Sequence, residues 1–125
     1  MNTAHLTATY EAPIVKLSVK GPVTDTDTKA ALDWFDHLGE QTEHYQLYLE
    51  MAKMDFPDLG TIRKSFLSLA TMMRGLEDCG KCAVVTDSPF LRSTAVVEGS
   101  ALPQMEVGSF GIVDLADAEE WLEAA

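Results

Sequence analysis

The sequence predicts an α/β domain with a mixed, mostly parallel five-stranded sheet in the element order ββαβαβαβα. Segments in which apolar and polar residues alternate are separated by segments in which apolar residues recur at helical spacing. The clearest helical segment directly follows the turn Met54-Asp55-Phe56-Pro57-Asp58, which connects it to a strand. A length of 125 residues suits one domain, and we expect residues 1–125 to form it.

Two strands are predicted near the N-terminus. Leu6, Ala8 and Tyr10 share one face of the first strand, and Val15, Leu17 and Val19 share one face of the second. Ala12-Pro13 separates the two strands, and Gly21-Pro22 ends the second. The short connection predicts an antiparallel pair.

Helices and strands alternate along the rest of the chain. Thr24 or Asp25 is predicted to cap the first helix, with Asp27 in its first turn and Gly39 as its C′ residue. There follow a strand over 45–52, a helix of about six turns over 57–78, a strand over 81–86, a helix over 89–98, a loop over 99–103, a strand over 107–113 and an acidic helix capped by Asp114.

The strand patterns also predict how the helices are placed. The second and third strands alternate cleanly, which is not expected of a sheet covered on both faces. We therefore expect about four helices, gathered mainly on one face. The other face is predicted to be partly open, with Tyr48 exposed on it. The segment Cys82-Ala83-Val84-Val85 is apolar throughout and is placed centrally in the sheet.

Charge and composition exclude several classes of function. The net charge is −11, which disfavours nucleic acid as a partner because a polyanion repels such a field. The N-terminal residues lack the basic and apolar regions of a secretory signal, and no apolar run is long enough to span a membrane. We expect a cytoplasmic protein. The cations at Arg63, Lys64 and Arg74 are interpreted mainly as a solvated helix face.

No residue set predicts a convincing active site. Cys79-Gly80-Lys81-Cys82 has C-x-x-C spacing, but redox use needs the first cysteine at the start of a helix. Here Cys79 is predicted to end a helix and Cys82 to lie in the core. No second Cys/His pair completes a zinc site, so we expect no metal and no cofactor.

The other candidate residues have simpler structural explanations. His5, His37 and His44 are scattered and are interpreted as surface histidines. Asp55 and Asp58 are interpreted as helix-capping residues rather than as an acid–base or Mg²⁺ pair, so an enzyme built on them ranks third among the functions considered. Gly108 and Gly111 belong to no phosphate-binding motif.

The segment Met54-Asp55-Phe56-Pro57-Asp58-Leu59-Gly60 resembles the strand-to-helix turn of STAS domains, and the chain is most similar to the bacterial SpoIIAA-like proteins of that superfamily. The N-terminal hairpin, the strands 45–52 and 81–86 and the closing Trp-Leu helix support the resemblance. Anti-anti-sigma factors carry a phosphorylatable serine in this turn. This chain has Phe56 and Pro57 there, which offer no hydroxyl group, so phosphorylation of the turn is not expected in this chain.

The resemblance to SpoIIAA-like proteins implies a binding domain for a nonpolar small molecule or lipid, held between mobile helices, with membrane contact but no integral insertion. The predicted site lies between helices 57–78 and 89–98, and anionic head groups could meet Arg63, Arg74 or Arg92. Its apolar lining is predicted to be Phe66, Leu69, Met73, Phe90, Leu91 and Val97. The alternative is a protein-interaction or regulatory module, which could form a homodimer.

Overall fold

The computed structural model describes residues 1–76, 78–99 and 105–124 and confirms the predicted element order. The strands are β1 (Leu6–Glu11), β2 (Ile14–Val19), β3 (Tyr45–Met51), β4 (Cys79–Thr86) and β5 (Glu106–Phe110). The helices are α1 (Asp25–Gly39), α2 (Leu59–Met73), α3 (Pro89–Gly99) and α4 (Leu115–Glu123), with single 3₁₀ turns η1 (Lys53–Asp55) and η2 (Ile112–Asp114).

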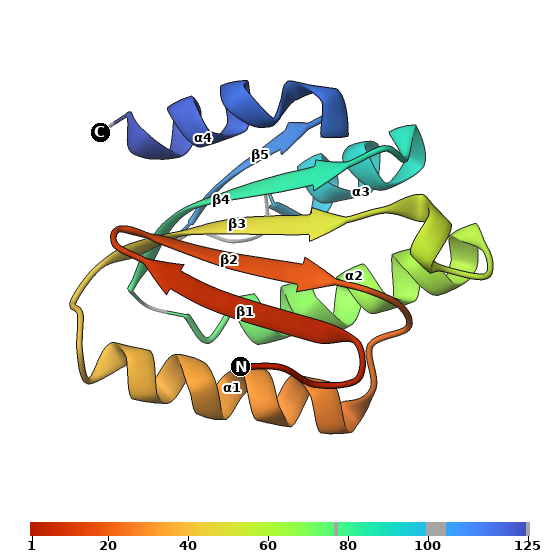
Figure 1. Ribbon diagram of the computed structural model, residues 1–125. Coiled ribbons are helices and arrows are strands. Elements are labelled where there is room, and N and C mark those ends of the chain that lie inside the picture. The colour runs from red at the N-terminus through yellow and green to blue at the C-terminus, as the bar shows by residue number, and fades with distance from the viewer. Residues whose placement is uncertain (77, 100–104, 125) are drawn as a thin grey trace.

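The five strands form one sheet in the order β1-β2-β3-β4-β5. β1 and β2 are antiparallel, as predicted, and the other three pairs are parallel. Every parallel connection therefore steps to the next strand in the same direction. Because such crossovers are right-handed, α1, α2 and α3 lie on the same face of the sheet. Figure 1 shows α1 and α2 along the lower side of the sheet and α4 along its upper side.

The main core lies between the sheet and the three crossover helices. Its largest fully buried side chains include Phe66, Leu69 and Met73 from α2 and Leu91 from α3. Leu17, Leu49 and Met51 contribute from β2 and β3. The alternation that predicted these strands thus identifies the face that the three helices cover.

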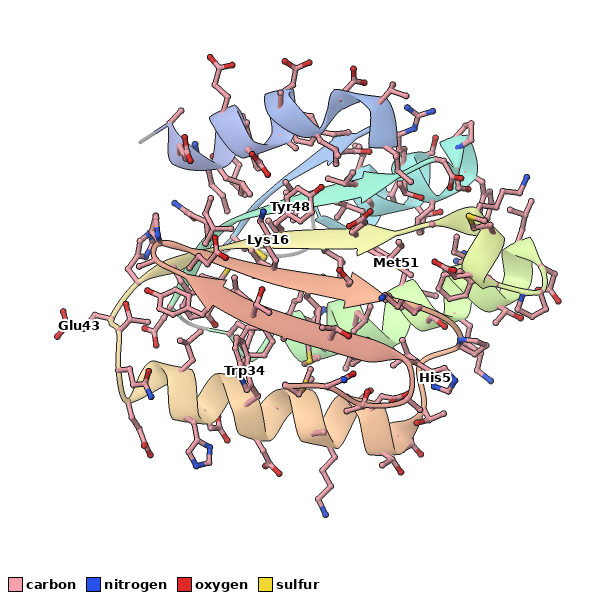
Figure 2. All side chains as sticks on the ribbon, viewed as in Figure 1. His5, Lys16, Trp34, Glu43, Tyr48 and Met51 are labelled. Atoms are coloured by element: carbon pink, nitrogen blue, oxygen red, sulfur yellow. The ribbon has the colours of Figure 1, made fainter. Side chains whose placement is uncertain are left out.

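The opposite face is covered in part by α4, which corrects the prediction that Tyr48 is exposed. Tyr48 is only 5% exposed and packs in a second apolar cluster with Ala118 and Leu122 of α4. Lys16 lies over the Tyr48 ring (Figure 2). The Lys16 ammonium group is also 3.3 Å from the Glu119 carboxylate. Burial, with the nearby carboxylates of Glu50 and Glu119, raises the pKa of the Tyr48 hydroxyl to about 12.

Lys81 fastens the C-terminal end of α4 to the sheet. Its ammonium group donates to the carbonyl oxygen of Trp121 at 3.0 Å and to that of Ala124. It also lies 5.0 Å from the centroid of the Trp121 ring. A cation near the last carbonyls of a helix is favourable because it meets the negative end of the helix dipole.

The structure shortens α2 from the predicted 57–78. Asp58 is the N-cap residue, so Pro57 lies outside the helix. At the other end the Gly75 N–H donates to the Met72 carbonyl oxygen, which turns the chain away. Leu76 continued the apolar pattern because it is buried, but it lies in this turn rather than in the helix. Glu77 lies outside the described residues.

Three other predicted ends were also wrong. β5 ends at Phe110 instead of 113, because the chain enters the 3₁₀ turn η2 after Gly111. Gly39 is the last helical residue of α1 rather than C′, and Glu40 caps the helix in a right-handed conformation. Gly99 belongs to α3, and residues 100–103 of the predicted loop lie outside the described residues.

The N-terminus of α1 is held by a buried carboxylate that the sequence indicated only in part. Thr24 is the N-cap residue, as predicted, and forms a capping box with Asp27. Asp27 is only 2% exposed, and its Oδ2 lies 2.9 Å from His5 Nδ1. His5 is therefore not a free surface histidine, which corrects that prediction. Figure 2 shows His5 beside the start of α1.

Burial alone would raise the pKa of Asp27. Hydrogen bonds from the Thr24 backbone N–H, from His5 and from the hydroxyls of Thr3 and Thr24 outweigh burial and hold the pKa of this carboxyl well below its usual range. The charged carboxylate therefore joins the residues preceding β1 to the start of α1.

Replacing Lys81 by methionine is expected to lower the free energy of unfolding by about 1 kcal/mol, because α4 loses its cation–carbonyl and cation–π contacts while the apolar stem is kept. Urea denaturation followed by circular dichroism measures the change. The control is Lys29→Met, since Lys29 is exposed on α1. Equal stability of the two variants would contradict the role given to Lys81.

Asp27→Asn is expected to lower the free energy of unfolding by about 1–2 kcal/mol at neutral pH, against little change for the exposed Asp25→Asn. The folded-state pKa of Asp27 is depressed, so its stabilisation is complete above the ordinary value of 3.8 and is lost as the pH falls through the folded-state pKa. The difference in the free energy of unfolding between Asp27→Asn and wild type should shrink below about pH 4. Chemical denaturation at several pH values tests this, and a difference that is unchanged in acid would refute it.

Candidate functional site

A shallow groove lies between α2 and α3, where the sequence predicted the binding site. Its volume is about 200 Å³, and it is lined by Arg63 of α2 and by Phe90, Ser93, Thr94 and Val97 of α3. Phe90 is 43% and Val97 66% exposed. The structure therefore brings Arg63, Phe90 and Val97 together, and adds the hydroxyls of Ser93 and Thr94, which the sequence pattern did not indicate.

The other apolar residues of the predicted site lie beneath this groove. Phe66, Leu69 and Met73 face the sheet from α2, and Leu91 does so from α3, each at most 1% exposed. They form the contact through which the two helices pack on the core. Apolar spacing identified them correctly as one cluster, but spacing alone does not distinguish a core-facing residue from one that lines a groove.

Two of the three candidate arginines lie away from the groove. Arg74 is the C-cap residue of α2, at the opposite end of that helix from Arg63. Arg92 is directed toward the start of η2, since its guanidinium would lie 3.2 Å from a Cβ atom on Gly111. Among the described cations of α2 and α3, Arg63 is thus the one that lines the groove.

The C-x-x-C segment lies within β4, so Cys79 begins a strand rather than ending a helix. The register with β3 shifts here, because Tyr45 pairs with Cys79 and Leu47 with Cys82. This extra residue on β4 is a β-bulge, and it places both cysteines in the main core although they are three positions apart. Gly80 lies in the bulge, where a Cβ atom would be only 2.7 Å from the His44 ring.

Both thiols are unsuited to nucleophilic or redox chemistry. Burial raises the pKa of Cys79 to about 12 and that of Cys82 well above its ordinary value. Cys82 Sγ lies 3.8 Å from Met73 Sδ, among apolar neighbours. The thiolate, which is the reactive form, is therefore strongly disfavoured.

The turn between β3 and α2 has a structural role. Asp58 Oδ1 accepts a hydrogen bond from the Thr61 backbone N–H at 2.7 Å, which confirms Asp58 as a capping residue. This hydrogen bond lowers the pKa of Asp58. Phe56 is 8% exposed and packs in the main core. Phe56 is thus a core residue that joins this turn to the sheet and helices.

Within residues 1–76, 78–99 and 105–124, no group of three or more histidine, cysteine, aspartate or glutamate side chains is arranged to hold a metal ion. None of the described helices combines the length and the apolar character needed to cross a membrane.

Comparison with known proteins assigns the chain to a family. The family model described as SpoIIAA-like matches residues 14–123, which is most of the chain. The chain belongs to the SpoIIAA-like family. No curated protein matches it in sequence. This assignment confirms the resemblance found in the sequence. It supports a binding or regulatory domain, and the family is generally non-enzymatic.

A solved structure shows the same fold. It is an uncharacterized protein of the DUF3478 family with a SpoIIAA-like fold, from Shewanella loihica PV-4. The TM-score is 0.65 over 98% of each chain, with 16% sequence identity. At this identity the comparison supports the fold of this SpoIIAA-like chain and carries no information about its ligand.

Neither cysteine is expected to react with iodoacetamide at about pH 8 in the folded protein, because both thiols are buried and protonated. Both should react fully in denaturant. Intact mass measured over time gives the number of added groups. Rapid modification of one cysteine under native conditions would show that β4 opens or that its bulge exposes a thiol.

Proposed function

We propose that this SpoIIAA-like chain is a non-enzymatic binding domain for a nonpolar small molecule or lipid with an anionic end. The observation that carries the proposal is the groove in which Arg63 stands beside the exposed side chains of Phe90 and Val97. The apolar part of the ligand would pack on these two side chains. The guanidinium, which always carries charge, would pair with a carboxylate or phosphate, and Ser93 and Thr94 could donate hydrogen bonds.

The size of the groove supports partial enclosure of the ligand. Its volume of about 200 Å³ is below the roughly 300 Å³ at which ligand pockets usually begin. It therefore suits part of a chain-like ligand. A longer ligand would need α3 to move away from α2, and the surface uncovered would be Phe66, Leu69, Met73 and Leu91. A ligand could also be taken up from a membrane through the same exposed face.

The alternative is a protein-interaction or regulatory module that lacks the phosphoacceptor serine. One observation favours it. Val96 is 58% exposed on α3 outside the groove, which makes the apolar surface wider than a small ligand requires. In that case α3 would contact a protein partner or a second copy, and the mass in solution would depend on concentration or on the partner.

The test uses dodecanoate and dodecanol, measured by titration calorimetry and by native mass spectrometry. Phe90→Ser should weaken both ligands about fivefold or more, because apolar contact is lost. Arg63→Gln should weaken dodecanoate about fivefold and leave dodecanol unchanged, because only the carboxylate pairs with the guanidinium.

Matched controls separate the groove from the general surface. Val113→Ser removes an apolar side chain that is 93% exposed on η2, and Lys64→Gln removes the neighbouring cation on α2. Both controls should bind like wild type. Equal binding by all four variants, or no uptake of either ligand by wild type, would exclude the groove as the site.

A further inference from the structure

A second and larger groove lies between α1 and the edge strand β1. Its volume is about 460 Å³. Thr9 and Tyr10 line it from β1, and Trp34, His37 and Leu38 line it from α1. Figure 2 shows Trp34 on the side of α1 that faces β1. None of these residues lines the α2–α3 groove, so the two sites are distinct.

The outer edge of β1 already accepts extended backbone. The segment before β1 folds back along this edge and pairs with it antiparallel. Ala8 N–H donates to the Met1 carbonyl oxygen at 3.0 Å, and Thr3 N–H donates to the Leu6 carbonyl oxygen at 2.8 Å. Residues 1–3 thus pair with β1 through a single antiparallel bridge and cover part of its edge.

The pairing stops before Tyr10. In an antiparallel ladder, the backbone groups of alternate residues point toward and away from the neighbouring strand. Leu6 and Ala8 point away from β2, and Tyr10, two residues further on, does the same. Within the described part of the chain, the outward N–H and C=O of Tyr10 have no hydrogen-bond partner, so the groove presents one donor and one acceptor of an open strand edge.

Three carboxylates of α1 act near this groove, against the ammonium group of Met1. A hydrogen bond of 2.8 Å between His37 Nδ1 and the Asp33 carbonyl oxygen is the largest cause that raises the pKa of His37. The charges of Glu40, Asp33 and Asp36 raise it further. The Met1 ammonium group also lines the groove, where it donates to the Ala8 carbonyl oxygen at 3.0 Å. Among the described residues, no lysine or arginine side chain lines it. Trp34 and Tyr10 add aromatic faces, which attract cations.

These features decide between occupants. A second copy of the chain would bring its own Asp33, Asp36 and Glu40 close to the same three carboxylates of the first copy. Because each copy also has a net charge of −11, the two copies would repel each other. A small cation would leave the backbone groups of Tyr10 unpaired. We propose that the groove between α1 and β1 binds an extended peptide segment that carries a lysine or arginine side chain. The peptide backbone pairs with Tyr10 in line with residues 1–3, and the cationic side chain lies against Trp34 within the field of the α1 carboxylates.

The probe is a capped heptapeptide, acetyl-Thr-Val-Thr-Arg-Thr-Val-Thr-amide, and its control has neutral citrulline in place of arginine. Titration is followed by backbone amide NMR shifts of the untagged protein at about pH 8.5, where His37 carries less positive charge. The arginine peptide should shift the Tyr10 amide and the Trp34 indole, and should bind about fivefold more tightly than the citrulline peptide. Its affinity should fall with added salt.

Two N-methylated peptides test the strand pairing. Only alternate residues of an added strand direct their N–H groups to the edge. Methylation of one alternate set should abolish binding, whereas methylation of the other set should be tolerated. Tolerance of both, or binding of argininamide as tight as that of the peptide, would overturn the peptide proposal in favour of a small cation.

Protein variants test the groove itself. The double variant Asp33→Asn/Glu40→Gln should weaken the arginine peptide about fivefold and leave the citrulline peptide unchanged, because only the charge attraction is removed. Its control is Asp117→Asn, which removes an exposed carboxylate on α4. Trp34→Leu should weaken the arginine peptide too. Shifts confined to α2 and α3, or equal binding of both peptides by every protein, would refute the proposal.

Discussion

The direction in which the strands follow one another determines the rest of this structure. From β2 to β5 each parallel crossover steps the same way, so right-handedness places three helices on one face and none on the other. The main core, the seam between α2 and α3, and the open flank between α1 and β1 all result from that layer of three helices. Among the described elements, α4 is the helix that covers part of the remaining face, where Tyr48 lies beneath it.

The periodicity of apolar residues was sufficient to predict the type and order of the elements. An element that buries one face must have apolar residues at the spacing of a helix or of a strand. The periodicity did not define where elements end. Leu76 keeps the helical spacing of α2 although it lies in a turn, because a turn residue can be buried as well. Tyr48 was misplaced for a different reason. Its strand is amphipathic, and the residues that cover its second face lie some 70 positions further along the chain.

The candidate site was predicted by region but only in part by residue. Apolar spacing on α2 and α3 selected side chains that face the sheet together with Phe90 and Val97, which do not. The contacts missed entirely are those between distant residues, such as His5 with Asp27 and Lys81 with the end of α4. The bulge at Gly80 was also missed, although a glycine within an apolar strand is a signal for one. For the α1–β1 groove, Trp34 lies one turn before His37 on α1, but nothing in that spacing indicates which strand edge is open.

The dependence of one sheet face on α4 has a consequence for biosynthesis. The ribosome makes β3 and β4 long before α4, so the three crossover helices can pack while the other face of these strands is still bare. During that interval Tyr48, Ala83 and Val85 are uncovered on two adjacent central strands. Exposed apolar strand surface of this kind is prone to aggregation. The nascent chain therefore has a period of vulnerability that ends only when α4 emerges and Lys81 meets its last carbonyl groups.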